Sequence, residues 1–196
     1  MKRLFDILAS GLGLLCLSPL FAILAIWIKA DSRGPVFYRQ VRVGRGNRDF
    51  RIFKFRSMRP DSDKGRLITV GGHDPRVTRS GYYIRKYKLD ELPQLINVFI
   101  GDMSLVGPRP EVRRYVNMYS PEQMRVLEVR PGITSLASIR YRNENEILAA
   151  SDDPDRTYVE KVMPDKLAID LEYVADASLI NDIRLIFSTF REIITK

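Results

Sequence analysis

Two adjacent acids, Asp90 and Glu91, stand out in a chain that is otherwise strongly basic. They lie in the stretch KYKLDELPQL, residues 86 to 95, just ahead of Pro93. The ordinary role of such a pair is to cap a helix, because carboxylate oxygens accept hydrogen bonds from the free N–H groups of a first turn. A helix start is also the positive end of the helix dipole, which favours ionised carboxylates and attracts phosphate. A cap and a site for phosphate chemistry are therefore both open at this point.

Arg109 is a second candidate, because a proline stands on each side of it. Pro108 and Pro110, in GDMSLVGPRPE (residues 101 to 111), make this stretch a stiff loop. They limit the freedom of the main chain and so preset the direction of the guanidinium group. A guanidinium held in this way suits bidentate binding of phosphate.

The element that positions the acids is a helix predicted to begin near Asp90. Apolar residues follow at the spacing of one helix face, i, i+3, i+4 and i+7: Leu92, Leu95, Ile96 and Phe99. Pro93 fits the first turn, where an N–H group needs no partner within the helix. The dipole of this helix is expected to keep both carboxylates ionised.

Before the acids, the sequence predicts a β-hairpin and a loop. Residues 36 to 38 and 50 to 55 are typical of two strands, and a glycine-rich turn at residues 44 to 47 joins them. Residues 60 to 80 are rich in Asp, Gly and Ser and predict a loop. His73 lies in that loop and is interpreted as an ordinary polar residue.

After the acids, the sequence predicts mainly helices. Ser120 and Gln123 have the spacing of a capping box at a helix start, and residues 143 to 164 predict a mobile loop with some helix. Two apolar patterns of helical spacing follow: Leu167, Leu171 and Val174, then Leu179, Ile183, Ile186, Phe187, Phe190 and Ile194. The second pattern is typical either of a core helix or of a helix lying flat on a membrane interface.

The composition limits the partners and the chemistry. The 196 residues carry a formal net charge of +8, which indicates an anionic partner such as nucleic acid, a phosphorylated substrate or anionic lipid. Nine bases and one acid lie in residues 33 to 59, so the anion is expected to meet the first half. One cysteine excludes an internal disulfide, and one histidine excludes a zinc-type cluster. Any metal must be a hard ion held by oxygens.

The N-terminal segment predicts insertion into a membrane. Asp6 is the only charged residue in positions 4 to 28, and the run is too long for a signal peptide and lacks a cleavage site. Basic residues flank both ends, which draws both ends to the cytoplasm. Ser18 and Pro19 stand in the middle, where proline kinks a helix and the serine hydroxyl can bond a carbonyl that the kink frees. We therefore expect a re-entrant helix-hairpin that returns to the same face, with a single crossing as the alternative.

Several motifs, in this order, resemble one family from end to end. They are KRLFD at residues 2 to 6, SP at 18 to 19, GPVFYRQVRVG at 34 to 44, FKFRSM at 53 to 58, LDELPQLINVFIGDMSLVGPRP at 89 to 110, RPGIT at 130 to 134 and DLEYV at 170 to 174. The chain resembles the monotopic phosphoglycosyl transferases, the bacterial sugar transferase superfamily, and in particular its small minimal-domain members.

The resemblance implies a reaction. A UDP-sugar donates its phosphosugar to a polyprenol phosphate such as undecaprenyl phosphate, and UMP is released. A covalent aspartyl-phosphosugar intermediate and Mg²⁺ are implied as well. By position, Asp90 matches the nucleophile and Glu91 its acidic partner. Both are expected to hold the metal, with a role of Glu91 as the base that deprotonates the acceptor left open. This reaction is the first membrane step of glycan and polysaccharide assembly.

Basic residues near the phosphates are also implied by the resemblance. Lys54, Arg85 and Arg109 match such residues directly. Arg142 matches a further phosphate-binding arginine, but SLASIRYRN departs from the usual family pattern here, so Arg140 is its rival.

The sequence thus predicts an α+β fold: a re-entrant membrane hairpin, a small β-hairpin and amphipathic helices at the membrane interface. Residues 1 to 32 form the anchor and residues 33 to 196 a catalytic domain integrated with it. The enzyme is expected to be monotopic on the cytoplasmic face of the bacterial inner membrane, with no nucleic acid partner. The sugar, the polyprenol length, the pathway and the oligomeric state, with a homodimer as one option, stay open.

Two other functions remain as alternatives. A membrane-anchored protein that binds nucleic acid or anionic lipid would not need the two acids, and its binding would weaken steeply with salt. A glycosyltransferase that moves only the sugar would release the nucleoside diphosphate. The nucleotide released therefore separates the two enzymatic hypotheses.

Overall fold

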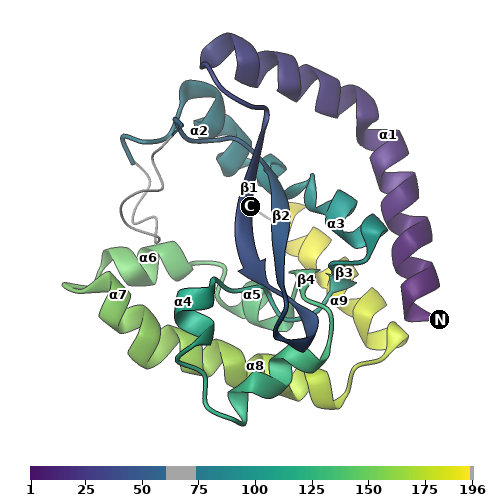
Figure 1. Ribbon diagram of the computed structural model, residues 1–196, viewed down its shortest axis with the longest axis vertical. Coiled ribbons are helices and arrows are strands. Elements are labelled where there is room, and N and C mark those ends of the chain that lie inside the picture. Colours follow the sequence, from purple (N-terminus) through teal and green to yellow (C-terminus); the bar gives the residue numbers. More distant parts are fainter. Residues whose placement is uncertain (61–73, 195–196) are drawn as a thin grey trace.

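The computed structural model describes residues 1 to 60 and 74 to 194. Helices and small sheets are mixed, which confirms the coarse fold prediction. In Figure 1 a long N-terminal helix runs along the edge of the molecule and bends over its top, while a long β-hairpin occupies the middle. The helices of the second half, α6 to α8, lie on the far side of the hairpin from α1.

Helix α1, Lys2–Asp31, is a single continuous helix of 30 residues that contains Pro19. Pro19 has no N–H group to give to the carbonyl of Leu15, four residues earlier. The Ser18 hydroxyl donates to that carbonyl at 2.8 Å, as the sequence predicted. The helix curves in Figure 1 but does not divide into two helices. Its return to one face of a membrane stays a prediction.

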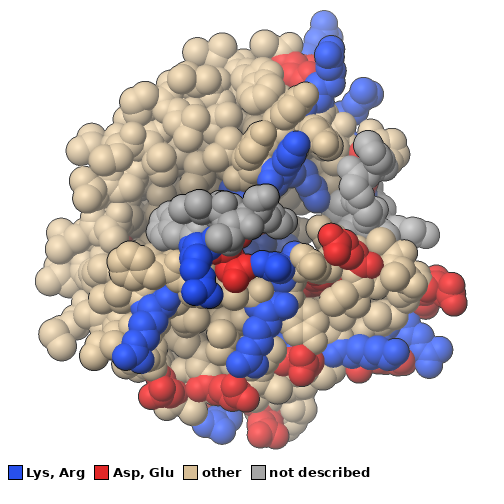
Figure 2. All heavy atoms as spheres, turned by 180° about the vertical axis from the view of Figure 1, so that it is seen from behind, with Lys and Arg blue, Asp and Glu red and all other residues tan. Residues whose placement is uncertain are grey.

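Most of α1 lies on the surface although it is apolar. Leu15 and Ile26 keep 72% and 71% of their surface exposed, far more than core residues do. In the described part of the chain α1 is the one helix long and apolar enough to cross a membrane, and only 11% of its most apolar stretch is buried. In Figure 2, turned so that α1 is on the left, that side is almost free of charged side chains. Such a surface is unusual for a water-soluble domain, and the helix fits association with a membrane.

Both ends of α1 are bonded to the rest of the protein. At its start, Arg3 donates to the carbonyls of Val98 (2.5 Å) and Phe99 (2.8 Å). Asp6 is buried and accepts hydrogen bonds from Ser104 and Leu105, both at 3.1 Å.

At the C-terminal end of α1, the guanidinium of Arg56 donates to the carbonyls of Ser32 at 2.7 Å and Arg33 at 2.6 Å. Asp31 accepts from the main-chain N–H of Ser80 at 2.9 Å and from its hydroxyl at 2.8 Å. The bond to Ser32, the C-cap residue, satisfies a carbonyl that the helix end leaves free, and the bonds to Asp31 tie the same end to residue 80.

The predicted hairpin is confirmed, with longer strands. β1, Phe37–Val43, pairs antiparallel with β2, Asp49–Phe55. The turn holds a short 3₁₀ helix, Arg45–Asn47, in which Gly46 and Asn47 have positive φ angles of 66° and 61°. Glycine and asparagine tolerate this region best, so the sequence of the turn explains its shape. Tyr38 faces Lys54 across the hairpin.

A second, parallel sheet lies close to the start of α1. β3, Ser104–Val106, pairs with β4, Gly132–Thr134. The stiff loop at residues 101 to 111 therefore contains a strand. A Cβ atom at Gly132 would lie 2.1 Å from the main-chain nitrogen of Gly107, so only glycine permits the two segments to approach this closely.

Short helices make up most of the remaining structure. Before and around the acids these are α2 (Arg79–Lys86), a 3₁₀ turn η2 (Leu89–Glu91) and α3 (Gln94–Ile100). After them come α4 (Arg113–Val116), η3 (Gln123–Glu128), α5 (Leu136–Arg140), α6 (Glu144–Ala149), α7 (Pro154–Thr157), the π-helical turn η4 (Tyr158–Val162), α8 (Met163–Ala175) and α9 (Leu179–Ile194).

Three sequence predictions about these helices need correction or refinement. Residues 143 to 164 are mostly helical, because Leu148, Tyr158 and Val162 are buried in the largest core cluster. The loop predicted for residues 60 to 80 ends earlier, since Thr78 caps α2; residues 61 to 73, with His73, lie outside the described residues. The capping box at Ser120 is confirmed by reciprocal bonds with Gln123 of 2.9 and 3.2 Å, but the element that follows is a 3₁₀ helix.

Candidate active site

The two acids lie in a turn of their own, not at the start of the following helix. Asp90 and Glu91 belong to η2, which follows Lys88 in a left-handed conformation with φ of 56°. Helix α3 begins at Gln94, and its N-cap is Pro93, which makes no side-chain cap bond. The prediction of Asp90 near the N-cap of that helix is wrong, because the left-handed residue and the tight turn end before the regular helix begins.

Glu91 is held by two cations from different elements. Lys54 of β2 donates to its Oε1 at 2.9 Å, and Arg109 donates through Nη1 to Oε2 at 3.2 Å and through Nη2 to Oε1. A fifth of the Glu91 side chain stays exposed. Burial alone would raise the pKa of Glu91, but the charges of Arg109 and Lys54 outweigh it and hold the pKa well below its ordinary value. Glu91 is therefore an ionised group with its hydrogen-bonding capacity largely taken.

Asp90 differs from its neighbour in having no hydrogen-bond donor among the described residues. Its pKa is raised from the ordinary value, first by desolvation and then by the charge of Glu91, while Lys54, Arg85 and Lys88 act in the opposite direction. A helix dipole was expected to lower the pKa of Asp90, whereas the pKa is raised. The reason is that the side chain lies among packed atoms ahead of α3 rather than at its open end. The result is a carboxyl group that is close to cations but not bonded to any of them.

The other predicted site residues lie at different distances from this pair. Arg85, at the end of α2, is near enough to lower the pKa of Asp90. Arg142 follows α5, is exposed and forms an ion pair with Glu192 of α9. Within the described chain, no contact joins Arg142 or its rival Arg140 to either acid. Their phosphate-binding role stays a prediction.

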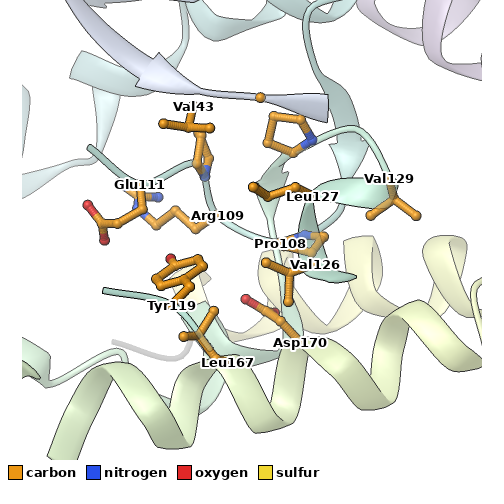
Figure 3. Close-up of a pocket in the computed structure, with 13 residues that line it drawn as sticks. Val43, Pro108, Arg109, Glu111, Tyr119, Val126, Leu127, Val129, Leu167 and Asp170 are labelled. Atoms are coloured by element: carbon orange, nitrogen blue, oxygen red, sulfur yellow. The ribbon is translucent and has the colours of Figure 1, made fainter. Parts of the chain in front are cut away.

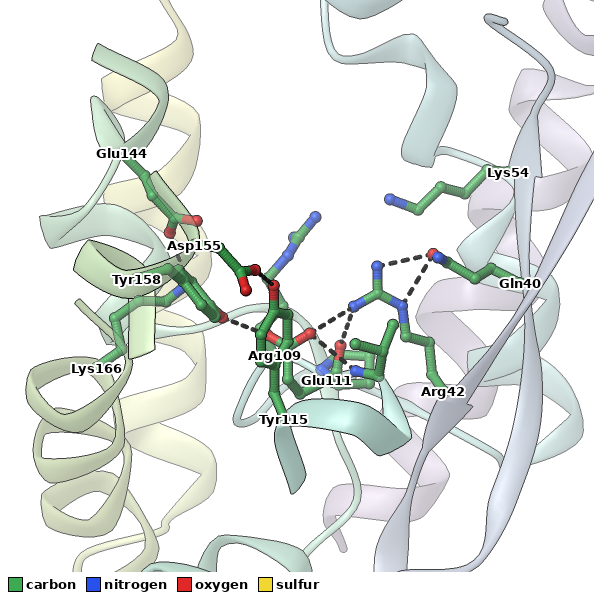
Figure 4. A network of polar contacts seen from close by, with 12 residues as sticks. Gln40, Arg42, Lys54, Arg109, Glu111, Tyr115, Glu144, Asp155, Tyr158 and Lys166 are labelled. Carbon is green, nitrogen blue, oxygen red and sulfur yellow. Dashed lines mark hydrogen bonds and ion pairs between the residues drawn. The ribbon is translucent and has the colours of Figure 1, made fainter. Parts of the chain in front are cut away.

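Glu111 fixes the loop that carries Arg109 (Figure 4). Its carboxylate accepts from Arg42 at 3.1 Å, from the N–H of Val112 at 2.8 Å and from the hydroxyl of Tyr158. Arg42 also donates to the carbonyl of Pro110 at 3.0 Å. These bonds tie the loop to β1 on one side and to η4 on the other, so the direction of Arg109 is set by tertiary contacts as well as by its prolines.

Asp170 of α8 lies behind the same loop, against a small cavity of about 20 Å³ (Figure 3). The Asp170 side chain is buried, and its Oδ1 has no hydrogen-bond partner. Burial raises the pKa of Asp170 to about 7, against the opposing effects of Lys166, the Ser135 hydroxyl and the main-chain N–H groups of Ala137 and Arg109. The carboxyl group thus joins α8 to the Arg109 loop.

Comparison with known proteins identifies the family. The family model described as "Bacterial sugar transferase" matches residues 1 to 196. The chain belongs to the bacterial sugar transferase family. This confirms the resemblance inferred from the motifs.

Named relatives of this sugar transferase are similar over almost the whole chain. The UDP-N-acetylgalactosamine-undecaprenyl-phosphate N-acetylgalactosaminephosphotransferase of Aeromonas hydrophila is 43% identical, over 99% of this chain and 44% of its own length. The undecaprenyl-phosphate glucose phosphotransferase of Komagataeibacter xylinus is 44% identical, over 100% of this chain and 36% of its own length. The exopolysaccharide production protein PSS of Rhizobium leguminosarum bv. phaseoli is 38% identical, over 96% of this chain and 92% of its own length. The chain thus spans less than half the length of the first two relatives.

The described residues offer a magnesium ion two carboxylates rather than a full cage. Within them there is no group of three or more His, Cys, Asp or Glu side chains that could hold a metal. Mg²⁺ is commonly bound by one or two carboxylates together with waters and substrate phosphates. Asp90, whose oxygens are bonded by none of the residues described, and Glu91, whose oxygens are bonded by two cations, fit such a shared site and not a site of protein ligands alone.

The sequence reasoning missed the residues that position Arg109 in this sugar transferase. Arg42 and Asp170 lie in motifs that carried the resemblance, and Glu111 directly follows one, yet none of the three was assigned a role. One signal was present. Residues paired across a hairpin share a face, and Tyr38 pairs with Lys54. Because side chains alternate along a strand, Arg42, four residues after Tyr38, lies on the same face as Lys54. Glu111 and Asp170 gave no such signal, because only tertiary packing brings Tyr158 of η4 against Glu111 and Asp170 of α8 behind the loop.

Proposed function

We propose that this protein moves a phosphosugar from a UDP-sugar to a polyprenol phosphate such as undecaprenyl phosphate, releasing UMP. The observation that carries the proposal is the contrast between the adjacent acids. Glu91 is ionised and bonded to Lys54 and Arg109, whereas Asp90 accepts no hydrogen bond from any described residue and lies among cations. The names of the relatives from Aeromonas hydrophila and Komagataeibacter xylinus, both undecaprenyl-phosphate sugar phosphotransferases, support the substrate class.

The proposed chemistry has two steps at phosphorus. A carboxylate oxygen of Asp90 attacks the β-phosphorus of the donor, and the bond from that phosphorus to the oxygen bridging the α-phosphate breaks, so that UMP leaves. A phosphate oxygen of the polyprenol phosphate then attacks the same phosphorus, and the bond to Asp90 breaks. The product is a polyprenyl diphosphate-sugar, and the carboxylate is regenerated. Two steps replace one direct transfer between two bulky anions.

The cations prepare the site for these anions. Lys54, Arg85, Lys88 and Arg109 surround the two acids, so positive charge exceeds negative charge by two. Both substrates carry phosphate and repel each other, and fixed positive charge lowers that repulsion in a partly dry site. Arg109 presents its guanidinium beside Glu91, where its pKa is raised further, so it stays charged throughout the reaction.

Mg²⁺ is part of the proposal, held by Asp90 and Glu91 together with substrate phosphates. When bound it would neutralise phosphate charge and polarise phosphoryl oxygens. The free oxygens of Asp90 and the residual exposure of Glu91 support this placement.

The membrane placement proposed is monotopic, on the cytoplasmic face of the bacterial inner membrane. Helix α1, at about 1.5 Å per residue, is about 45 Å long, yet hydrogen bonds tie both of its ends to the same body. A helix that crossed the bilayer would have its ends on opposite sides. Attachment of both ends therefore supports the re-entrant hairpin over a single crossing.

Helix α9 is proposed to lie at the same interface. Ile180 and Phe187 expose 65% and 70% of their surface, and the helix carries charged residues between its apolar ones. An amphipathic helix of this kind can bury its apolar side at the boundary of headgroups and acyl chains. The acceptor lipid would then reach the acids at the level of its own phosphate.

Nucleotide release tests the function. Purified protein is incubated with a panel of UDP-sugars, undecaprenyl phosphate and Mg²⁺, and the nucleotide product is identified. UMP is expected with at least one sugar; release of UDP would show that only the sugar moves and would contradict the proposal. Label from a phosphosugar donor, added without acceptor, should remain on a peptide that contains Asp90 and be released by hydroxylamine.

Topology is tested separately by single cysteines. In a Cys16→Ser background, cysteines placed before Leu4 and after Ile28 should both be protected from a membrane-impermeant reagent in intact cells. Labelling of the N-terminal position from the periplasm would favour the single crossing.

A further inference from the structure

A second cavity lies at the start of α1, apart from the two acids. Its volume is about 220 Å³, and its lining includes Lys2, Arg3 and Asp6 of α1 together with Arg45, Glu128 and Arg130. It shares no residue with the cluster of Lys54, Glu91 and Arg109. The proposed phosphotransfer gives it no role.

The arginines of this cavity are oriented but not neutralised. Arg45 donates through Nε to the carbonyl of Glu128 at 3.0 Å, and Arg130 donates through Nε to the carbonyl of Gly101 at 2.9 Å. In both cases the two terminal Nη groups have no partner in the described part of the protein. Arg3 likewise donates only to main-chain carbonyls. A guanidinium that is fixed by one nitrogen and free at its fork is prepared for a bidentate oxyanion.

The residues that line the cavity keep a net positive charge after their ion pairs are subtracted. Lys2 is neutralised by Asp182, with which it forms an ion pair. Three arginines then face two acids, and both acids are poor partners for them. Asp6 is buried and bonded to Ser104 and Leu105, whereas Glu128 is exposed and has no ion pair among the described residues.

The surroundings of the cavity indicate where its anion comes from. Leu4 and Leu8, on the same stretch of α1 as Arg3, expose 62% and 64% of their surface. An apolar strip next to fixed arginines matches the two parts of a phospholipid, an acyl chain and a charged headgroup. A free anion would need only the arginines.

We infer that this cavity binds a phosphate group, and specifically the headgroup phosphate of an anionic phospholipid at the start of α1. Arg45 and Arg130 supply the forks, and Arg3 adds charge beside the apolar strip. The inference uses the membrane placement proposed above but does not depend on the phosphotransfer.

Lipid retention in native mass spectrometry tests this site. The full chain is released from detergent micelles that contain equal amounts of phosphatidylglycerol and phosphatidylcholine. Wild-type protein should retain phosphatidylglycerol selectively. Arg45→Gln with Arg130→Gln should retain it about tenfold less, since each basic residue adds substantially to binding of an anionic headgroup. The matched control, Arg48→Gln with Arg125→Gln, removes the same charge from exposed positions outside the cavity and should behave as wild type.

Three results would overturn the inference. The first is equal retention of both lipids, and the second is unchanged retention in the cavity variant. The third is saturation by inorganic phosphate alone with no preference for lipid, which would assign the cavity to free phosphate. Thermal unfolding of each variant without added lipid shows whether it is folded. UMP release, measured on the same samples, reports on the proposed reaction independently of lipid retention.

Discussion

The protein contains two carboxylate clusters with similar ingredients and different consequences. Asp182 of α9 is buried, pairs with Lys2 and accepts from the hydroxyl of Tyr173 at 2.6 Å. Glu91 is also bonded to two donors, but it is partly exposed and stands next to a carboxyl group that has no donor in the described part of the chain. The first cluster holds α1, α8 and α9 together, whereas the second leaves a carboxyl group able to react.

The difference lies in the balance and the accessibility of charge. One cation meets one carboxylate at Asp182, so the cluster is neutral and has no reason to attract a ligand. Four cations surround two carboxylates at Glu91, so the site favours a further anion. A balanced pair with a buried carboxylate serves structure, and an unbalanced cluster with a partly exposed carboxylate favours binding. Substitutions in the two clusters should therefore affect different measurements.

The largest effect is expected at Asp90. Asp90→Asn keeps the size of the side chain but removes the nucleophile, so UMP release should fall at least about 10³-fold while the melting temperature changes little. Wild-type protein should also lose activity as the pH falls through the pKa of Asp90, which lies above the ordinary value. Substantial activity of Asp90→Asn would contradict this role and would remove the functional difference between the two carboxylate clusters.

Arg109 should come next. Arg109→Ala is expected to lower kcat about 10²- to 10³-fold, as the loss of one preorganised charge donor typically does. Arg109→Lys should recover little, because an ammonium group cannot give the two parallel bonds that Glu91 receives. Steady-state kinetics on both variants shows whether the planar guanidinium is needed or only a positive charge. Near-normal turnover of the lysine variant would mean that Arg109 provides only positive charge.

Asp182 should show the opposite pattern. Asp182→Asn leaves Lys2 without its counter-charge and is expected to lower the free energy of unfolding by about 1 to 3 kcal/mol. Turnover of the folded fraction should stay within about twofold of wild type, because no contact among the described residues links this cluster to Glu91. Thermal melts and initial rates measured below the melting temperature provide the comparison. A large loss of kcat with unchanged stability would contradict the structural role.

A pH-dependent effect on stability is expected at Asp170. Its folded-state pKa of about 7 lies above its value in the unfolded chain, so the folded protein keeps a proton that the unfolded protein loses. Stability from this group is therefore present below about pH 4 and is lost as the pH rises to about 7. Asp170→Asn removes the titration, so the melting temperature of wild type relative to the variant should fall between these values. A constant difference across this range would show that Asp170 does not carry the proton.

The smallest effect is expected from breaking the exposed ion pair of Arg142. Arg142→Ala removes a contact with Glu192 that contributes little to stability, because exposed pairs are worth about 0 to 1 kcal/mol. If Arg142 also binds phosphate during turnover, KM for the donor should rise while the melting temperature is unchanged. Arg140→Ala is the matched control and identifies which arginine acts.

The sequence by itself determined the family, the apolar N-terminal segment and the β-hairpin. Long ordered motifs give the family, and short-range patterns give the elements, since the turn around Gly46 and the carbonyl freed by Pro19 depend only on nearby residues. The sequence also brought attention to Asp90, Glu91 and Arg109 through their spacing and their prolines. It placed the acids one element too late, because a left-handed residue at Lys88 cannot be inferred from apolar periodicity.

Only the tertiary structure decided how these residues differ from one another. Glu91 and Asp90 are adjacent and chemically alike, but Lys54 and Arg109, 37 and 18 positions away, form their hydrogen bonds with Glu91 and none with Asp90. The same applies to Asp170, whose raised pKa comes from burial under a loop that lies far from it in sequence. Desolvation and charge–charge interaction depend on distance in space, so a carboxylate acquires its role when the chain folds around it.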